Sequence, residues 1–232
     1  MTQTRTIAVD GVTHELVSEG TGDARQGVIL FPTVMGISQL ERGFAERLAG
    51  LGYSVLLADL YGRRFAPDDR NEAMAAMTTL RQDRAALRDR LLGVLGTAIE
   101  QEEIDDECVA AIGFCFGGQN ALDLARSGAA LAGAASFHGL FDRPGLPAKP
   151  IKAKVAAYHG WDDPLVPPEA VIALAAELTA AGADWQIHAF GHVGHGFTNP
   201  GATGAMPGIK FDQRTADRAW AACDAFLAEC FA

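Results

Sequence analysis

The sequence has few of the features that mark membrane, metal-binding or disulfide-rich proteins. It contains only four cysteines, at positions 108, 115, 223 and 230, and no two of them stand in a C-x-x-C spacing. No stretch is long and apolar enough to cross a bilayer, and the N-terminus lacks the apolar segment of a signal peptide. We therefore expect a cytoplasmic protein with reduced thiols, no bound metal and no membrane contact.

Basic residues are also scarce. Nineteen lysines and arginines oppose 29 aspartates and glutamates, so the formal net charge is -10. This excess disfavours nucleic acid and anionic membrane surfaces as partners, and a small molecule is the expected ligand. With 232 residues, 49% of them hydrophobic and 21% charged, the chain has the composition of a protein with a sizeable core. We expect a single α/β domain over residues 1–232.

Segments typical of buried strands alternate with segments of helical periodicity. At the start, Asp10-Gly11 between two short segments, 6–9 and 14–18, predicts a β-hairpin. Strands are then predicted at 28–31, 53–58, 108–112, 131–137, 154–158 and 185–190, and helices at 40–51, 71–100 (long or broken), 119–126, 168–181 and 212–231. Because parallel neighbours need crossover connections, this order predicts a mostly parallel sheet of about seven or eight strands with helices on both faces.

The segment Gly-Phe-Cys-Phe-Gly-Gly at 113–118 lies between a predicted strand and a predicted helix. This is the pattern of a nucleophile elbow, in which flanking glycines let strand and helix approach each other while the central residue takes strained backbone angles. Cys115 is then a candidate nucleophile. The alternative is a structural cysteine beside a helix start, because this residue type is among the most buried.

Two other strand ends carry an acid and a base. The turn after 154–158 contains Asp162 and Asp163, and the glycine-rich loop after 185–190 contains His192 and His195. Taken alone, the aspartates are equally typical of turns and each histidine of a solvated loop. Together with Cys115 they give nucleophile, acid and base in the chain order of the α/β-hydrolase triad, at strand ends where ligands bind in such sheets.

The sequence resembles the dienelactone hydrolase family over nearly the whole chain. The motifs that carry the resemblance are Gly-Phe-Cys-Phe-Gly-Gly at 113–118, Gly-Trp-Asp-Asp-Pro-Leu-Val-Pro at 160–167, Gly-His-Gly-Phe at 194–197 and Asp-Leu-Tyr at 59–61. The resemblance implies the α/β-hydrolase fold, a cysteine nucleophile and a hydrolase of small or cyclic esters that needs no metal or cofactor and is a monomer or weak homodimer. It selects Asp163, which precedes x-x-Val-Pro, and His195, which precedes x-Phe.

On this interpretation His195 accepts the proton of Cys115, and Asp163 orients the imidazole. The thiolate then attacks an ester or lactone carbonyl and forms an acyl-enzyme. The backbone N–H of Phe116 and, by analogy with the family, that of Val34 are expected to form the oxyanion hole. The competing hypothesis is a non-catalytic ligand-binding or redox-sensing relative in which Cys115 is oxidised or merely packs.

Two positions depart from the family pattern. Thr33 stands where the family has a glutamate that helps to deprotonate the cysteine, so we expect His195 alone to activate Cys115. Asn199 stands where the family has an arginine that grips a substrate carboxylate, and an amide cannot form that charge-assisted pair. Other arginines could supply the charge, although a helix or loop arginine is exposed by default, and the aromatic candidates are equally typical of a core. The candidate substrate-binding residues are Thr33, Arg63, Arg64, Arg70, Arg81, Phe114, Phe116, His138, Trp161, Phe197 and Asn199.

Overall fold

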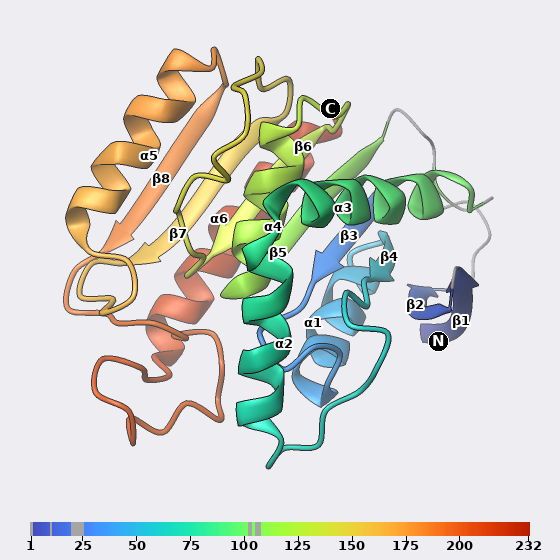
Figure 1. Cartoon of the computed structure of the whole chain (residues 1–232), viewed down its shortest axis with the longest axis horizontal. Coiled ribbons are helices and arrows are strands. Elements are labelled where there is room, and N and C mark those ends of the chain that lie inside the picture. Colours follow the sequence, from blue (N-terminus) through green and yellow to red (C-terminus); the bar gives the residue numbers. More distant parts are fainter. Residues whose placement is uncertain (1, 10, 20–25, 102–103, 105–107) are drawn as a thin grey trace.

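The computed structural model of the chain describes residues 2–9, 11–19, 26–101, 104 and 108–232. Its strands form one eight-stranded sheet in the order β1-β2-β4-β3-β5-β6-β7-β8 (Figure 1). Pairs β1–β2 and β2–β4 are antiparallel, and every other neighbouring pair is parallel. This confirms the predicted mostly parallel sheet. The strands are β1 (Thr2–Val9), β2 (Val12–Glu19), β3 (Gly27–Phe31), β4 (Ser54–Leu57), β5 (Val109–Phe114), β6 (Gly133–Phe137), β7 (Lys154–Gly160) and β8 (Trp185–Phe190).

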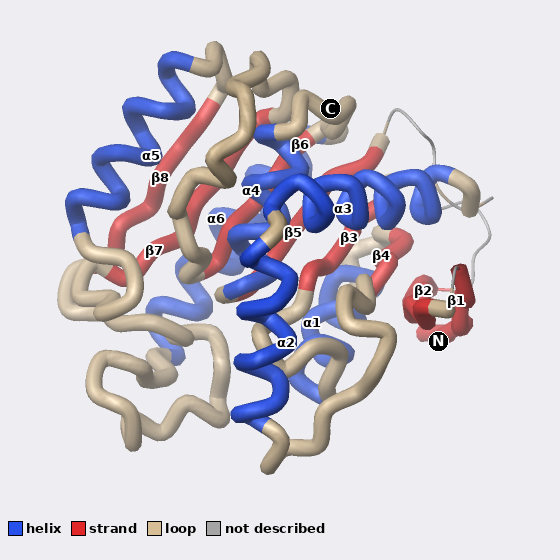
Figure 2. Tube along the Cα trace, in the orientation of Figure 1, coloured by secondary structure: helices blue, strands red, loops and turns tan. Residues whose placement is uncertain are grey.

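Helices cover both faces of the sheet (Figure 2). The helices are α1 (Gln39–Ala49), α2 (Arg70–Gln82), α3 (Arg84–Ile99), α4 (Phe116–Arg126), α5 (Pro168–Ala180) and α6 (Gln213–Cys230). Side chains of α1 and α6 form one core with one face of the strands, and those of α2 to α5 form a second core with the other face. Because side chains alternate along a strand, Ile29 of β3 belongs to the second core and its neighbour Leu30 to the first.

The boundaries of several elements differ from the predicted ones. The expected helix over 71–100 is two helices, because Asp83 has extended backbone angles (φ -121°, ψ 87°) and its side chain caps α3 by accepting the N–H of Ala86. Gly93 and Gly96 both lie within α3 and do not end it. Strands β1 and β2 pair as the predicted hairpin, although Asp10 of its turn lies outside the described residues. Among the described helices, none combines the length and apolarity needed to span a membrane.

Candidate active site

Cys115 occupies a strained turn between β5 and α4. Its φ of 56° and ψ of -115° lie in a region that residues with a side chain rarely adopt. The flanking glycines are required by packing, because a Cβ at Gly113 would lie 1.9 Å from the carbonyl oxygen of Gly117 and a Cβ at Gly117 would lie 2.1 Å from that of Phe31. The backbone N–H of Cys115 donates to Phe137 O at 3.0 Å, which ties the turn to β6. The elbow thus holds its cysteine at the carboxyl edge of the sheet.

The Cys115 thiol lies among groups that stabilise a negative charge. Burial disfavours the thiolate, but the charge and hydrogen bond of His195 and the backbone N–H groups of Phe116 and Val34 outweigh it, so the pKa of Cys115 is lowered. Phe116 begins α4, and Val34 lies in the loop between β3 and α1. The two donors expected for an oxyanion hole therefore converge on the sulfur from two different elements.

His195 is held by Asp163. The Nδ1 atom of the ring lies 2.7 Å from Asp163 Oδ2, and both side chains are buried. The other carboxylate oxygen, Oδ1, accepts the backbone N–H of Leu165 at 2.8 Å, which fixes the acid in the turn after β7. Burial would lower the pKa of His195, but the charges and hydrogen bonds of Cys115 and Asp163 raise it. These contacts therefore favour the protonated, imidazolium form of His195.

The neighbouring acid and histidine form a different pair. His192 Nδ1 lies 3.9 Å from Asp162 Oδ2, and both side chains are exposed to solvent. Of the two acids and two histidines that the sequence offered, the structure thus brings Asp163 and His195 to Cys115 and leaves the other two on the surface.

Glu41 is a buried carboxylate beside this site that sequence reasoning missed. Its Oε1 accepts the backbone N–H of Thr33 at 3.2 Å and the Thr33 hydroxyl at 2.7 Å. Its Oε2 accepts the backbone N–H of Ser38 at 3.1 Å and also the Ser38 hydroxyl. Ser38 and Glu41 form a capping box at the start of α1. The S-x-x-E spacing in the sequence was the signal that could have revealed this carboxylate.

Tyr61 is a second neighbour of the site that was not among the candidates. Its hydroxyl donates to the carbonyl oxygen of Val34 at 3.1 Å, and its ring stacks near that of Phe116 at 6.4 Å. Burial, and then the negative charge of Cys115, raise the pKa of Tyr61, so the phenol is protonated. Asp59 accepts the backbone N–H of Tyr61 at 2.8 Å and thereby shapes the turn that presents the ring.

His138 packs beside His195 but belongs to the interior. It is 1% exposed, its ring centroid lies 5.0 Å from that of His195, and its Nε2 lies 2.8 Å from Thr198 Oγ1. Burial and then the positive charge of His195 hold the pKa of His138 well below its usual range. A neutral ring therefore packs against the charged one, and Thr198 links it to the loop that carries His195.

The candidate arginines have partners of their own. Arg63 pairs with Glu72 at 2.5 Å, and Arg81 pairs with Asp142 at 2.8 Å. The Nη2 of Arg70 lies 3.7 Å from the sulfur of Met206, and Arg64 pairs with Asp59 and Glu15. None of these contacts involves Cys115 or His195, so a role in binding substrate stays a prediction for each arginine.

Four of the candidate rings, those of Phe114, Phe116, His138 and Phe197, are at most 1% exposed. Phe114 and Phe197 are both 0% exposed and pack in the core with α1 and α6, so they do not line an open pocket mouth. Phe116 is also buried, at the start of α4. Trp161, by contrast, is 39% exposed. Asn199 accepts the N–H of Gly201 at 2.8 Å, which is the local bond of a turn residue.

A hollow of about 470 Å³ lies beside the carboxyl ends of β6 and β7. Leu140 and Leu165 line it, two residues after His138 and Asp163 respectively, and Met74 and Met77 of α2 form another wall. Arg81 of α2 places a positive charge at the edge of the hollow. Within the described ranges, no cluster of three or more His, Cys, Asp or Glu side chains is arranged to hold a metal ion.

Comparison with known proteins identifies the family and the fold of the chain. The chain is similar to the solved structure named m3DLH, with a TM-score of 0.91 and 37% identity over 100% of this chain and 99% of that one. A dienelactone hydrolase-like promiscuous phosphotriesterase from metagenomic libraries gives a TM-score of 0.87 and 32% identity over 100% and 99% of the two chains. The carboxymethylenebutenolidase of Rhodococcus opacus is 27% identical over 205 residues, which cover 84% of this chain and 79% of that protein. The model of the dienelactone hydrolase family matches residues 16–231. The chain therefore belongs to the dienelactone hydrolase family, whose members are hydrolases of the α/β-hydrolase fold.

Proposed function

We propose that the protein hydrolyses small carboxylic esters or lactones through a Cys115–His195–Asp163 triad and an acyl-enzyme. The observation that carries the proposal is the placement of the strained Cys115 thiol among His195 and two backbone N–H donors, with His195 bonded to Asp163 at 2.7 Å. A cysteine that merely packs needs neither a strained backbone nor a buried acid and base beside it.

In the proposed first half-reaction, the Cys115 thiolate attacks the carbonyl carbon and forms a C–S bond, while the carbonyl electrons move to oxygen. The N–H groups of Phe116 and Val34 then bind the oxyanion in place of the sulfur. Loss of one such donor costs about 3 kcal/mol of transition-state stabilisation in comparable enzymes. The tetrahedral intermediate collapses, and the leaving alkoxide takes the proton of the His195 imidazolium.

In the second half-reaction, neutral His195 takes a proton from water, and the hydroxide attacks the thioester. The C–S bond breaks, the carboxylic acid leaves, and the thiolate–imidazolium pair is restored. Asp163 stays ionised throughout and stabilises the imidazolium through its bond to Nδ1. For a lactone the leaving alkoxide remains attached to the acyl group, so ring opening precedes hydrolysis of the thioester.

The proposed substrate is uncharged near the reacting bond. The Thr33 hydroxyl donates a hydrogen bond to Glu41, so Thr33 offers Cys115 no basic group. The side-chain oxygen of Asn199 accepts a hydrogen bond within its own turn. The hollow lined by Met74, Met77, Leu140 and Leu165 is the proposed place for the apolar part of the substrate. We also propose a cytoplasmic monomer or weak homodimer that acts without a cofactor.

The test is intact-protein mass spectrometry after brief mixing with p-nitrophenyl acetate, p-nitrophenyl butyrate and an enol-lactone, together with turnover assays on the same compounds. We expect a mass increase equal to the acyl group on Cys115, and loss of both signals in Cys115→Ala. Paraoxon joins the panel because the metagenomic relative is described as a promiscuous phosphotriesterase. It would leave a diethylphosphoryl group on the same sulfur.

Cys230→Ala is the matched control, because burial raises the pKa of Cys230 to about 12 and makes it a poor nucleophile. This variant should keep full turnover and full labelling. Absence of turnover and of any mass shift on the folded wild-type protein, across the whole panel, would instead favour a ligand-binding or redox-sensing role for Cys115.

A further inference from the structure

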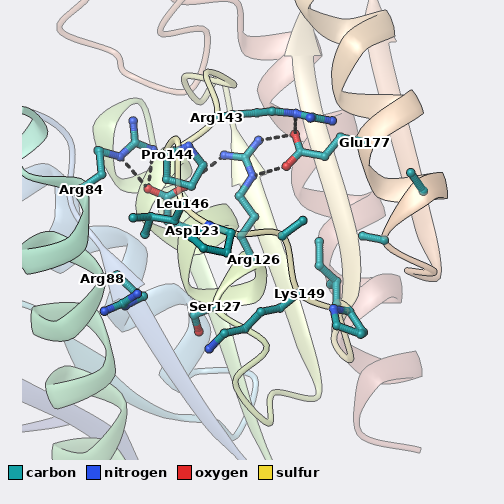
Figure 3. Close-up of a pocket in the computed structure, with 16 residues that line it drawn as sticks. Arg84, Arg88, Asp123, Arg126, Ser127, Arg143, Pro144, Leu146, Lys149 and Glu177 are labelled. Atoms are coloured by element: carbon teal, nitrogen blue, oxygen red, sulfur yellow. Dashed lines mark hydrogen bonds and ion pairs between the residues drawn. The ribbon is translucent and has the colours of Figure 1, made fainter.

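A second cavity, of about 390 Å³, lies at the opposite end of α4 from Cys115 (Figure 3). It is enclosed by the C-terminal ends of α4 and α5, the first turns of α3 and the loop that joins β6 to β7. Because α4 has 11 residues and a helix rises 1.5 Å per residue, its two ends are about 15 Å apart. Cys115, Asp163 and His195 do not line this cavity, although Arg143 and Glu177 border both it and the hollow beside β6 and β7.

The floor of the cavity is a buried network of ion pairs. Arg126, whose side chain is 6% exposed, pairs with Glu177 at 2.9 Å and with Asp123 at 3.0 Å. Arg84, 9% exposed, pairs with Asp123 at 2.5 Å and with Asp142 at 2.7 Å. Figure 3 shows Arg84 of α3, Asp123 and Arg126 of α4 and Glu177 of α5 side by side at the cavity. Their carboxylates are therefore already neutralised, and the network fixes the floor in one arrangement.

Three further cations stand around this floor, at Arg88, Arg143 and Lys149. Arg88 pairs with its exposed neighbour Asp89, and the Nε of Arg143, whose side chain is 65% exposed, lies 3.2 Å from Glu177. Within the part of the chain that the structure describes, Lys149 forms no ion pair. On a chain of net charge -10, this local excess of positive charge next to a cavity is unusual and attracts an anion.

The remaining wall is apolar and stiff. It is formed by Pro144, Leu146, Pro147, Pro150, Ile151 and Ala180. Three prolines within seven residues fix the backbone of the loop, so little conformational entropy is lost when a ligand binds. A volume of about 390 Å³ falls in the range of small-molecule sites, about 300–1,000 Å³.

We propose that this cavity binds a small organic acid, with its apolar body against the proline-rich loop and its carboxylate toward Arg88, Arg143 and Lys149. The apolar wall accounts for the body. The rim accounts for the anionic group, because Arg88 and Arg143 have exposed or shared acidic partners and Lys149 has no ion pair among the described residues. The inference is independent of the chemistry proposed at Cys115, because none of the three triad residues lines this cavity and the proposed anion contacts at Arg88 and Lys149 lie outside the hollow beside β6 and β7.

The test uses 2-naphthoate as the probe, with its neutral analogue 2-naphthamide, in calorimetric titrations of the full chain. We expect 2-naphthoate to bind and the amide to bind at least about tenfold more weakly, because the amide lacks the charge that the rim cations attract. Inorganic phosphate, which has the charge but no apolar body, should compete poorly. Absence of 2-naphthoate binding at millimolar concentration, or equal affinities for the acid and the amide, would overturn the proposal.

Two variants locate the binding. The double variant Arg88→Gln/Lys149→Gln should lower the affinity for 2-naphthoate by at least about tenfold, because it removes two of the three rim charges. Ala180→Trp should also lower this affinity, because the indole would fill the cavity from an exposed position of α5. Arg214→Gln/Arg218→Gln, the matched control, makes the same change in net charge at exposed positions of α6 and should bind like wild type. Unchanged affinity in both cavity variants would place the ligand elsewhere and refute this site.

Discussion

Thr33 donates two hydrogen bonds to one carboxylate oxygen of Glu41, from its backbone N–H at 3.2 Å and from its hydroxyl at 2.7 Å. Glu41 is 0% exposed, and its second oxygen accepts the N–H and hydroxyl of Ser38. One buried carboxylate therefore fastens both ends of the loop that presents the N–H of Val34 to Cys115. Position 33 carries a threonine where the family resemblance implies a glutamate, and a different acid, Glu41, accepts hydrogen bonds from that threonine.

Replacing Glu41 with Gln should impair turnover more than binding. The amide can accept on one side only, so two buried donors of the loop lose their acceptor, at a cost of about 1–3 kcal/mol each. If Glu41 positions the Val34 N–H for an oxyanion, kcat should fall by about tenfold or more while KM changes little, because the interaction is made in the transition state. Steady-state kinetics on the best ester of the panel measure this split.

Position 33 supplies the matched controls for that prediction. Thr33→Ser keeps the hydroxyl and the backbone donor, and should retain wild-type kcat. Thr33→Val keeps the shape but removes the hydroxyl, and should lower kcat in the same direction as Glu41→Gln. Equal kcat values for the serine and valine variants would show that the hydroxyl bond does not position the loop.

The alkylation of Cys115 by iodoacetamide should persist to lower pH than that of an ordinary thiol. The pKa of Cys115 is lowered because His195 and two N–H donors outweigh the effect of burial, and the thiolate is the form that reacts. The rate should therefore be half-maximal below about pH 8.5, the value of an unperturbed cysteine. In His195→Ala the thiol stays buried but loses the main group that lowers its pKa, so the midpoint should move above pH 8.5. Mass spectrometry of the Cys115 peptide at a series of pH values gives the profile.

His192→Ala is the control for this experiment. His192 is fully exposed and its nearest acid is Asp162, so its removal should leave the midpoint unchanged. A midpoint that is the same in wild type and in His195→Ala would mean that His195 does not stabilise the thiolate.

The sheet could be predicted because it depends on local signals, whereas the choice of Asp163 and His195 over Asp162 and His192 came only from the resemblance to the family. Strand periodicity and the turn residues that follow each strand can be recognised in short segments of the sequence. The partners of the arginines could not be predicted in this way. Arg81 meets Asp142 across 61 residues, and such a pair depends on how α2 packs against the loop after β6. Tyr61 lay inside a motif that was recognised, but its bond to Val34 joins the ends of β3 and β4, which only the folded sheet brings together.

The two adjacent acids of the turn after β7 should differ sharply in their effect on turnover. Asp163→Asn removes the charge that supports the His195 imidazolium and allows the wrong ring tautomer, so kcat should fall by about 10³-fold or more, as in other triads. Asp162→Asn changes only the exposed contact with His192 at 3.9 Å and should leave kcat within about twofold of wild type. Similar losses in both variants would contradict the assignment of Asp163 as the acid of the triad.

A glycine-to-alanine substitution should have opposite effects on stability at two positions. At Gly117 the new Cβ would lie 2.1 Å from the carbonyl oxygen of Phe31, which is backbone and cannot move aside without disturbing β3. Gly117→Ala should therefore lower the free energy of unfolding by at least about 2 kcal/mol. At Gly93, inside α3, nothing lies within 4 Å of a new Cβ, so Gly93→Ala should raise it by about 0.5–1 kcal/mol through the better helix propensity of alanine. Urea unfolding of the two variants decides the matter, and a Gly117→Ala protein as stable as wild type would show that the elbow has room for a side chain there.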